Sequence, residues 1–291
     1  MRLRKPFMAM DTLPYVGTES FPKCSAKHAS YQTSTIEEMS MTCVAQRILI
    51  IIVVSGLGLM GSLASAEVTP YQAEETARLI ATLLSTGRVV IDRNQTLIDD
   101  PNKGAKGFTP DVFERQVVNE FRTRTGVDLT KPTSGHLPSG TTNLLRALLE
   151  ASKEVVAEAQ PVINQQGVGY KNFIPATFGS QVAGRFSARS GIQLKQTTLE
   201  PRNPKNAPDP YEEAVLRRLL TQPSQSVTIS EVETGNHKLR VLTPIYYTRD
   251  CLACHGGPAG EMDISGYRKE GAEEGDLAGA ISVSIPLDAV K

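Results

Sequence analysis

The sequence predicts an α+β fold in which a set of N-terminal helices precedes an antiparallel sheet. Before Gly191, apolar residues recur at the three- and four-residue spacing of amphipathic helices. After Gly191, the chain alternates apolar and polar side chains in short runs, as strands with one buried face do. The order of helices, helix, hairpin, loop and final strand, without an internal repeat, favours the α+β class.

The first predicted helix has clear start and stop signals. Thr69 is suited to the N-cap, Pro70 to the first turn, and Gln72 completes a capping box. Apolar residues follow at helical spacing, and Gly87 is the predicted end. The next segment, 88–92 (RVVID), is a short β-prone run.

Three further helices are predicted before Gly191. One starts at Thr109-Pro110 and stops at Gly126. Another runs from about Thr141 to Ala159 and is bounded by Pro161. A short helix begins at Pro175.

The second half of the chain predicts the sheet. Its elements are an edge strand over 192–197, a helix that starts at Asp209-Pro210, strands over 226–233 and 238–247 joined by a hairpin turn at 234–237, and a last strand over 279–287.

The composition excludes some classes of function. Lys and Arg together number 31, as do Asp and Glu, so the formal net charge is zero. No basic stripe occurs, and we therefore expect no nucleic-acid partner. Hydrophobic residues make up 40% of the chain, which is sufficient for a proper core.

Residues 47–66 have the pattern of a secretory signal peptide. Arg47 precedes an apolar stretch over 48–63, and Ala64-Ser65-Ala66 has the form of a cleavage site. We expect export to the periplasm, with inner-membrane anchoring as the alternative if the segment stays uncleaved. The preceding residues are polar and aperiodic, so the true start is predicted at Met39 or Met41. The predicted organisation is a leader over 1–66 and one domain over 67–291.

Cys251-Leu252-Ala253-Cys254-His255 is the motif on which the functional prediction rests. C-x-x-C-H is the attachment site of a c-type haem, in which two thiols form thioethers and the histidine becomes an axial iron ligand. Cleavage after Ala66 leaves Cys251 and Cys254 as the only cysteines. A disulfide between them and half of a zinc site are the alternatives.

The sixth iron ligand is left open by the sequence. Met262, His136 and His237 are candidates, beside water, an open site, or a lysine or tyrosine. Met262 follows His255 closely in sequence, and a fully extended segment of that length reaches only about 24 Å, so ligation would strain the loop. His136 lies in a flexible connector and His237 in the hairpin turn.

Two further segments are candidates for the haem environment. Arg202 stands beside a proline-rich turn, and its guanidinium suits a haem propionate, with Glu212 or a backbone carbonyl as the alternative partner. Tyr170-Lys171-Asn172-Phe173 is a candidate for lining a haem face, although Phe173 is better suited to the core.

Three stretches resemble a known bacterial family, the PAS-like c-type haem domains once filed as a domain of unknown function. The stretches are 197–216 (TTLEPRNPKNAPDPYEEAVL), 242–260 (LTPIYYTRDCLACHGGPAG) and 275–287 (GDLAGAISVSIPL). The resemblance covers roughly 75–290. It implies a PAS-like antiparallel sheet with an N-terminal helical elaboration, and covalent haem on Cys251 and Cys254 with His255 as axial ligand. Members occur alone in the periplasm and as sensor parts of histidine kinases and chemoreceptor-like proteins.

The expected function is therefore a single-haem sensor of redox state or of a small gas. With no output segment after the last strand, its signal must pass to a separate kinase, chemoreceptor or redox protein. A mono-haem electron carrier is the alternative. An enzyme such as a small peroxidase is least expected, because histidine is scarce.

Overall fold

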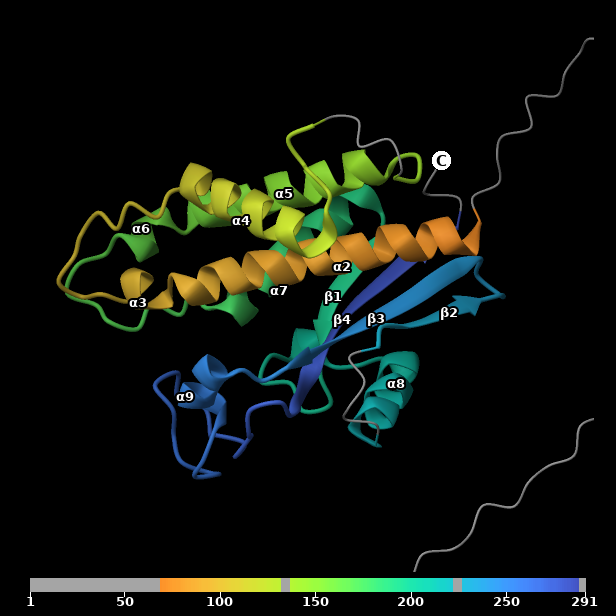
Figure 1. Ribbon diagram of the computed structural model, residues 1–291. Coiled ribbons are helices and arrows are strands. Elements are labelled where there is room, and N and C mark those ends of the chain that lie inside the picture. Colours follow the sequence, from red (N-terminus) through yellow and green to blue (C-terminus); the bar gives the residue numbers. More distant parts are fainter. Residues whose placement is uncertain (1–68, 132–136, 222–226, 288–291) are drawn as a thin grey trace, which may run out of the picture. The chain divides into compact units, whose positions relative to one another are not determined.

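A four-stranded antiparallel sheet lies at the centre of the computed structural model, which describes residues 69–131, 137–221 and 227–287 (Figure 1). Strand β4 (Leu277–Pro286) pairs with β1 (Gln193–Thr197) and β3 (Lys238–Tyr246), and β3 pairs with β2 (Ile229–Glu233). The strand order is β1-β4-β3-β2, so β1 is an edge strand as predicted. The predicted α+β class with an antiparallel sheet is confirmed.

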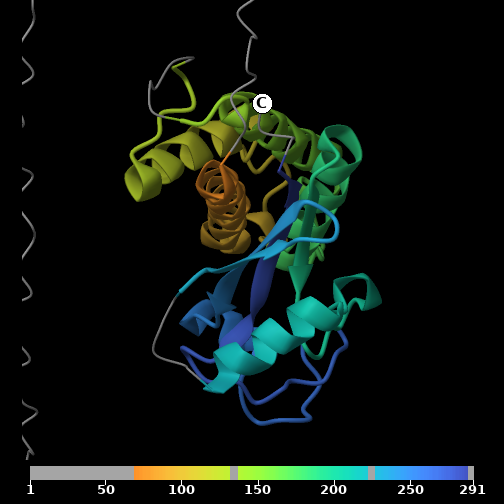
Figure 2. The same ribbon diagram turned by 90° about the vertical axis from the view of Figure 1, so that its right-hand side faces the viewer.

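Helices precede the sheet along the chain and cover one of its faces (Figures 1 and 2). Helix α2 packs against β3 and β4, and the longer helices α4, α5 and α7 pack around α2. The elements before the sheet are α2 (Pro70–Arg93), α3 (Gln95–Ile98), α4 (Pro110–Thr125), α5 (Thr141–Glu158), α6 (Gln160–Ile163) and α7 (Pro175–Ser190).

Helix α2 begins as predicted and ends later than predicted. Thr69 and Gln72 form the expected capping box. The predicted stop at Gly87 and the β-prone run over 88–92 are wrong, because the helix continues to Arg93. Gly87 is buried inside the helix, where an added Cβ would lie 2.9 Å from a ring carbon of Phe178. The glycine therefore allows α7 to pack closely against α2 and does not end the helix.

The other predicted helices are found with small changes at their ends. In α4, the Thr109 hydroxyl accepts from the Val112 N–H, and Gly126 adopts the left-handed conformation that ends the helix. Helix α5 ends one residue before the predicted Ala159, and Pro161 belongs to the short α6. Helix α8 (Pro210–Thr221) also starts where the sequence predicts.

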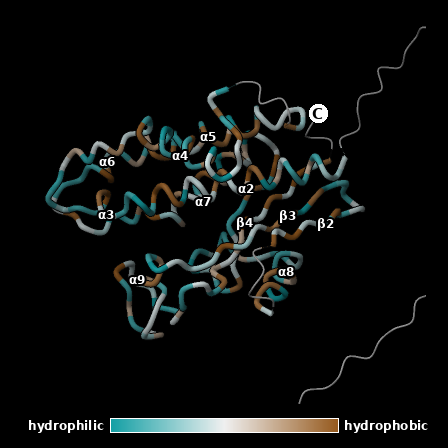
Figure 3. The backbone as a smooth tube through the Cα atoms, viewed as in Figure 1, coloured by the Kyte–Doolittle hydropathy of each residue, from teal (hydrophilic) through white to brown (hydrophobic). Residues whose placement is uncertain are grey.

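The two faces of the sheet pack against different partners. In β3 and β4, alternate residues such as Val241 and Val283 face the large helical core, while Leu242 and Ala280 pack with α8. Figure 3 shows hydrophobic residues recurring along α2, β3 and β4, the elements that meet in the large core. This alternation is the predicted period of half-buried strands.

The C-x-x-C-H motif lies in the long connection from β3 to β4. This connection contains a short 3-10 helix, η2 (Arg249–Cys251), which leads directly into α9 (Leu252–His255). All described residues belong to one compact unit, Ala64–Lys291. Within these residues no helix is both long and apolar enough to cross a membrane. The predicted signal segment lies outside the described residues.

Candidate functional site

The backbone of the motif is fixed on both sides of His255. The Gly256 N–H donates to the Leu252 carbonyl at 2.9 Å, which closes the single turn of α9. An added Cβ at Gly256 would lie 2.6 Å from that carbonyl oxygen, so only glycine fits directly after the histidine. The Ala272 N–H donates to the His255 carbonyl at 2.9 Å and ties the motif to the loop that returns to β4.

The imidazole of His255 is held through one of its two nitrogens. Its Nδ1 lies 2.8 Å from Oε2 of Glu270 and 3.5 Å from the Tyr247 hydroxyl, and its ring packs against that of Tyr247 with centroids 5.0 Å apart. A carboxylate only accepts hydrogen bonds, so Nδ1 carries a proton in this contact. Burial, reinforced by Glu270, raises the pKa of Tyr247 to about 12. Nε2 makes no hydrogen bond within the part of the chain that the structure describes.

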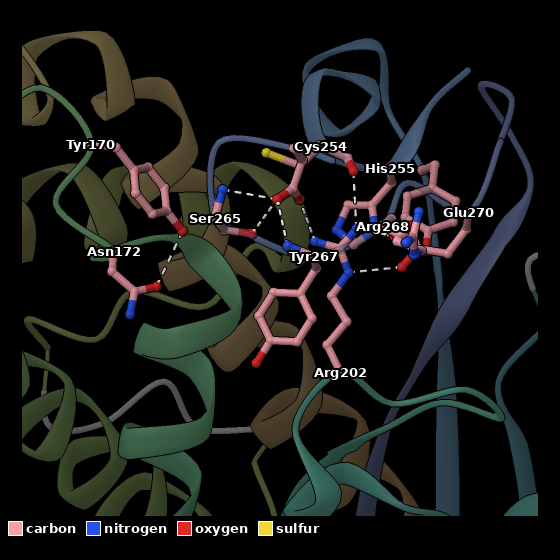
Figure 4. Close-up of polar contacts among 11 residues, drawn as sticks. Tyr170, Asn172, Arg202, Cys254, His255, Ser265, Tyr267, Arg268 and Glu270 are labelled. Atoms are coloured by element: carbon pink, nitrogen blue, oxygen red, sulfur yellow. Dashed lines mark hydrogen bonds and ion pairs between the residues drawn. The ribbon is translucent and has the colours of Figure 1, made fainter. Parts of the chain in front are cut away.

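The two motif cysteines are free thiols and are partly buried. Burial raises the pKa of the Cys254 thiol, and the nearby Asp263 carboxylate adds to this effect. In Figure 4 the Cys254 sulfur points away from Arg202. Cys251 contacts the Thr248 hydroxyl, with oxygen and sulfur 3.3 Å apart. Both thiols therefore remain available for covalent attachment.

Arg202 is a central contact of the site (Figure 4). Its guanidinium pairs with Glu270 at 2.7 and 2.9 Å and with Asp263 at 2.6 Å, and donates to the Cys254 carbonyl at 2.9 Å. Burial alone would lower its pKa, but the two carboxylates outweigh burial and raise it. A carbonyl partner was the alternative that the sequence left open, whereas Glu212 pairs elsewhere, with Lys195. In this structure the Arg202 donors are therefore engaged by protein groups, and its pairing with a propionate stays a prediction.

Asp263 is the buried partner of Arg202. Its side chain is fully buried and accepts from the Ser265 N–H and hydroxyl and from the Tyr267 N–H. Burial alone would raise its pKa, but these hydrogen bonds and Arg202 hold it well below the usual range. Asp263 thereby fixes the turn of a small hairpin over 260–269, whose ends pair through backbone hydrogen bonds.

The two described candidates for a sixth ligand, Met262 and His237, lie on other segments than the motif. Met262 lies on the hairpin, where it forms an isolated antiparallel β-bridge with Arg268. Its surface is 55% exposed. His237 lies at the turn before β3, whereas the motif follows the other end of this nine-residue strand, roughly 30 Å away at the rise of extended chain. His136 falls outside the described residues. Among the described residues, no group of three or more His, Cys, Asp or Glu side chains has the arrangement of a metal site.

Helix α2 contributes charged groups that face the motif. Arg88 and Asp92 are one turn apart, and electrostatic interactions link Arg88 to Cys251 and Asp92 to Asp250. The Arg88 Nε is buried and has no hydrogen-bond partner in the described part of the chain. Burial lowers the pKa of Arg88, and Cys251 and Asp92 act against this effect. A buried cationic donor without an acceptor lies on the motif side of α2.

Tyr170 lies near the motif, and the lining of a haem face by its segment stays a prediction. Its hydroxyl donates to Asn172 at 3.1 Å (Figure 4). Burial raises its pKa, and Cys254 and Asp263 contribute to the same direction, while Ser265 acts against it. Phe173 is buried against Phe178, as its core interpretation predicts.

Sequence reasoning did not find Glu270, Tyr247, Asp263 or Arg88. Glu270 lies fifteen residues after His255 in a loop rich in Glu and Gly, where no periodicity distinguishes one carboxylate from another. A sequence signal for Arg88 did exist. If the helix is continued past Gly87, the four-residue spacing places Arg88 and Asp92 on one helix face.

The fold and the site define a class of protein first: an α+β protein that carries a C-x-x-C-H motif in the loop between two strands of an antiparallel sheet. The model of the Tll0287-like family matches residues 71–286, and the chain belongs to this family. A solved structure, the crystal structure of the cyanobacterial heme-protein Tll0287, matches with 20% identity and a TM-score of 0.35, over 50% of this chain and 92% of that chain. No curated protein matches the sequence.

Proposed function

We propose that this protein binds one c-type haem, held covalently by Cys251 and Cys254 with His255 Nε2 as axial iron ligand. We further propose that it is exported to the periplasm and senses redox state or a small gas. It does not turn over a substrate, and it signals to a separate kinase, chemoreceptor or redox protein. Its four-stranded antiparallel sheet is the counterpart of a PAS domain.

The hydrogen bond between His255 Nδ1 and Glu270 is the observation that carries this proposal. Metal-binding histidines commonly donate their second nitrogen to a carboxylate, which fixes the tautomer and the ring orientation. A histidine in a disulfide-bearing loop would need no such partner. The adjacent free thiols complete the set of groups that a c-type haem requires.

The residues present fit a haem. Besides the motif, the orphaned Nε of Arg88 supplies a buried positive donor toward Cys251, and Tyr170 supplies a flat side chain on the Cys254 side. When bound, the haem supplies reversible one-electron chemistry and binding of small ligands at the iron. The chain's own residues position it: the thiols fix its edge, and Glu270 orients the imidazole.

Family membership supports the same cofactor. The family takes its name from Tll0287, and the protein of that name is described as a cyanobacterial heme-protein. This supports haem as the ligand class, whereas covalent attachment rests on the C-x-x-C-H motif of this chain.

The test is to express the full chain in a host that exports and matures c-type haem. We expect haem to stay with the polypeptide on a denaturing gel, and the signal to disappear in Cys251→Ala/Cys254→Ala. Wild-type protein without covalent haem would overturn the proposal. As a matched control, Thr248→Ala keeps both thiols and should keep the haem.

Carbon monoxide then tests the sensing role. A shift of the Soret band of the reduced protein would support an exchangeable sixth position and gas sensing. An unshifted low-spin spectrum would rule gas sensing out. It would support redox sensing or the alternative role of a mono-haem electron carrier.

A further inference from the structure

Glu270 contacts both His255 and Arg202 through the same oxygen atom. Its Oε2 lies 2.8 Å from His255 Nδ1 and 2.9 Å from Arg202 Nη2, while Oε1 lies 2.7 Å from Arg202 Nε. The arginine therefore holds the carboxylate by both oxygens, and the imidazole shares one of them. Two donors compete for the electron density of a single acceptor.

We infer that Glu270 and Arg202 set the electron-donor strength of His255 with opposite signs. Glu270 strengthens donation from Nε2 by accepting from Nδ1, and Arg202 weakens it by drawing on the same carboxylate. The inference rests on the proposed function, because it concerns the iron that His255 would bind. It assigns Glu270 and Arg202 as positioning residues that tune the reduction potential, a role that neither family membership nor the motif implies.

The physical basis is the polarity of the Nδ1–H bond. A carboxylate acceptor gives the imidazole partial imidazolate character and raises its basicity as a metal ligand. A more basic ligand stabilises the ferric state over the ferrous state and lowers the reduction potential. Charge-assisted pairing with a guanidinium reduces the basicity of the carboxylate, so Arg202 acts in the opposite direction.

The rest of the cluster keeps this arrangement fixed. Asp263 holds Nη1 of Arg202 at 2.6 Å, and the Cys254 carbonyl accepts from Nη2 at 2.9 Å. Arg202 is therefore anchored to the motif itself, and its side chain packs 5.3 Å from the ring centre of Tyr267. Asp263 is fully buried and Arg202 is partly buried, so their interaction is only weakly screened by salt, whereas Glu270 is exposed.

The test measures the midpoint potential of haem-loaded full-length variants. Glu270→Gln is expected to raise the potential and Arg202→Gln to lower it, each by about a tenfold change in the ratio of reduced to oxidised protein, or about 59 mV for one electron. Arg202→Lys keeps the charge and should shift the potential less than Arg202→Gln. Glu261→Gln is the matched control, because Glu261 lies on the same hairpin and pairs with Lys269.

Opposite shifts with an unchanged control support the inference. Shifts of one sign in both variants, or shifts no larger than that of Glu261→Gln, overturn it. If Arg202→Gln does not fold, the midpoint potential of Glu270→Gln is compared with that of Glu261→Gln. A tenfold change in the ratio of reduced to oxidised protein in Glu270→Gln alone supports the inference, and its absence refutes it. Absence of covalent haem in wild-type protein is a different result, which refutes the proposed function instead.

Discussion

Two clusters of charged side chains in this protein use the same chemistry for different ends. The α8 cluster joins the start of α8 to the sheet, and the motif cluster surrounds the C-x-x-C-H loop. Each combines two carboxylates with two groups that donate to them. The α8 cluster is Lys195, Asp209, Glu212 and Arg240; the motif cluster is Arg202, His255, Asp263 and Glu270.

In the α8 cluster every donor serves the fold. Glu212 is buried, pairs with Lys195 at 2.6 Å, and accepts from the Asp209 N–H at 3.0 Å, which completes the N-terminal cap of α8. Arg240 pairs with Asp209 at 2.6 Å and stacks over Tyr211. Lys195 and Arg240 sit on strands, so the cluster fastens a helix to a rigid sheet.

In the motif cluster all four residues lie on loops or at the end of the one-turn α9. One carboxylate holds an imidazole nitrogen, and the other nitrogen has no hydrogen-bond partner among the described residues. The comparison teaches that charge pairing alone does not indicate function. What separates the clusters is a histidine, for whose second nitrogen we propose a ligand role.

Glu212→Gln should break the α8 cluster without affecting the site. Loss of the charge leaves Lys195 and Arg240 with a weaker partner, and we expect a loss of about 3 kcal/mol in the free energy of unfolding. Urea denaturation followed by circular dichroism measures it. The midpoint potential of the haem should stay unchanged, and a shifted potential would contradict the separation of the two clusters.

Glu213→Gln is the matched control for this prediction. Glu213 is the next residue, pairs with Arg217 one turn along the same helix, and is 46% exposed in its side chain. Exposed pairs of this kind contribute about 0.5 kcal/mol or less. Equal losses in the two variants would show that the burial of Glu212 is not what matters.

Asp263→Asn should destabilise the motif cluster in a pH-dependent way. Burial acts to raise the pKa of Asp263, but Ser265, Arg202 and the Tyr267 N–H lower it below that of an unfolded aspartate, about 3.9. Its stabilising effect is therefore complete above that value and is lost as the pH falls below it. We expect Asp263→Asn to cost about 2 kcal/mol near neutral pH.

The measurement is unfolding by guanidinium at a series of pH values. The difference in the free energy of unfolding between wild type and Asp263→Asn should be constant near neutral pH and should narrow below about pH 4. Glu261→Gln serves as the control from the same hairpin. A gap that widens on acidification would have the wrong sign and would contradict the assigned partners.

Much of the fold could be predicted because local signals agreed with tertiary packing. The capping box at Thr69, the Thr109 cap with Gly126, and the alternation of β4 all specify local geometry and burial at once. The motif residues can also be read from the sequence, because their spacing is that of a c-type haem attachment site, and their role stays a prediction. The partners Glu270 and Asp263 were not found, because long-range pairing in an irregular loop leaves no periodic trace in the sequence.

The error at Gly87 has a specific physical origin. Glycine is a common stop signal, and here it is used inside a helix so that Phe178 can approach the backbone. This close approach depends on Phe178, which lies 91 positions after Gly87 and is not included in local propensity. The mistaken end of α2 then hid Arg88 and Asp92 as members of the site.

Gly87→Ala tests this explanation. The new Cβ would lie 2.9 Å from a buried Phe178 ring carbon, so we expect a loss of about 1 to 2 kcal/mol despite the higher helix propensity of alanine. Gly184→Ala is the matched control, since it lies within α7 with nothing within 4 Å of an added Cβ. The control should gain up to about 1 kcal/mol in thermal or urea unfolding. A gain at both positions would contradict the packing role of Gly87.

Arg88→Gln should have the smallest effect of these variants, a small shift of the midpoint potential. It tests whether α2 belongs to the site. The Arg88 guanidinium is a desolvated positive charge beside Cys251 without a hydrogen-bonded carboxylate. A positive charge near the iron favours the ferrous state, so removing it should lower the midpoint potential by less than a tenfold change in the redox ratio.

Arg93→Gln provides the control on the same helix, because Arg93 is exposed and pairs with Glu120 on α4. Its potential should match wild type. If Arg88→Gln behaves like Arg93→Gln, the charge of α2 does not reach the haem, and the loops of the motif cluster alone determine the potential. If only Arg88→Gln lowers the midpoint potential, α2 belongs to the site through a residue that no motif identifies. Arg88 then joins the motif cluster, whereas Arg93 on the same helix serves the fold.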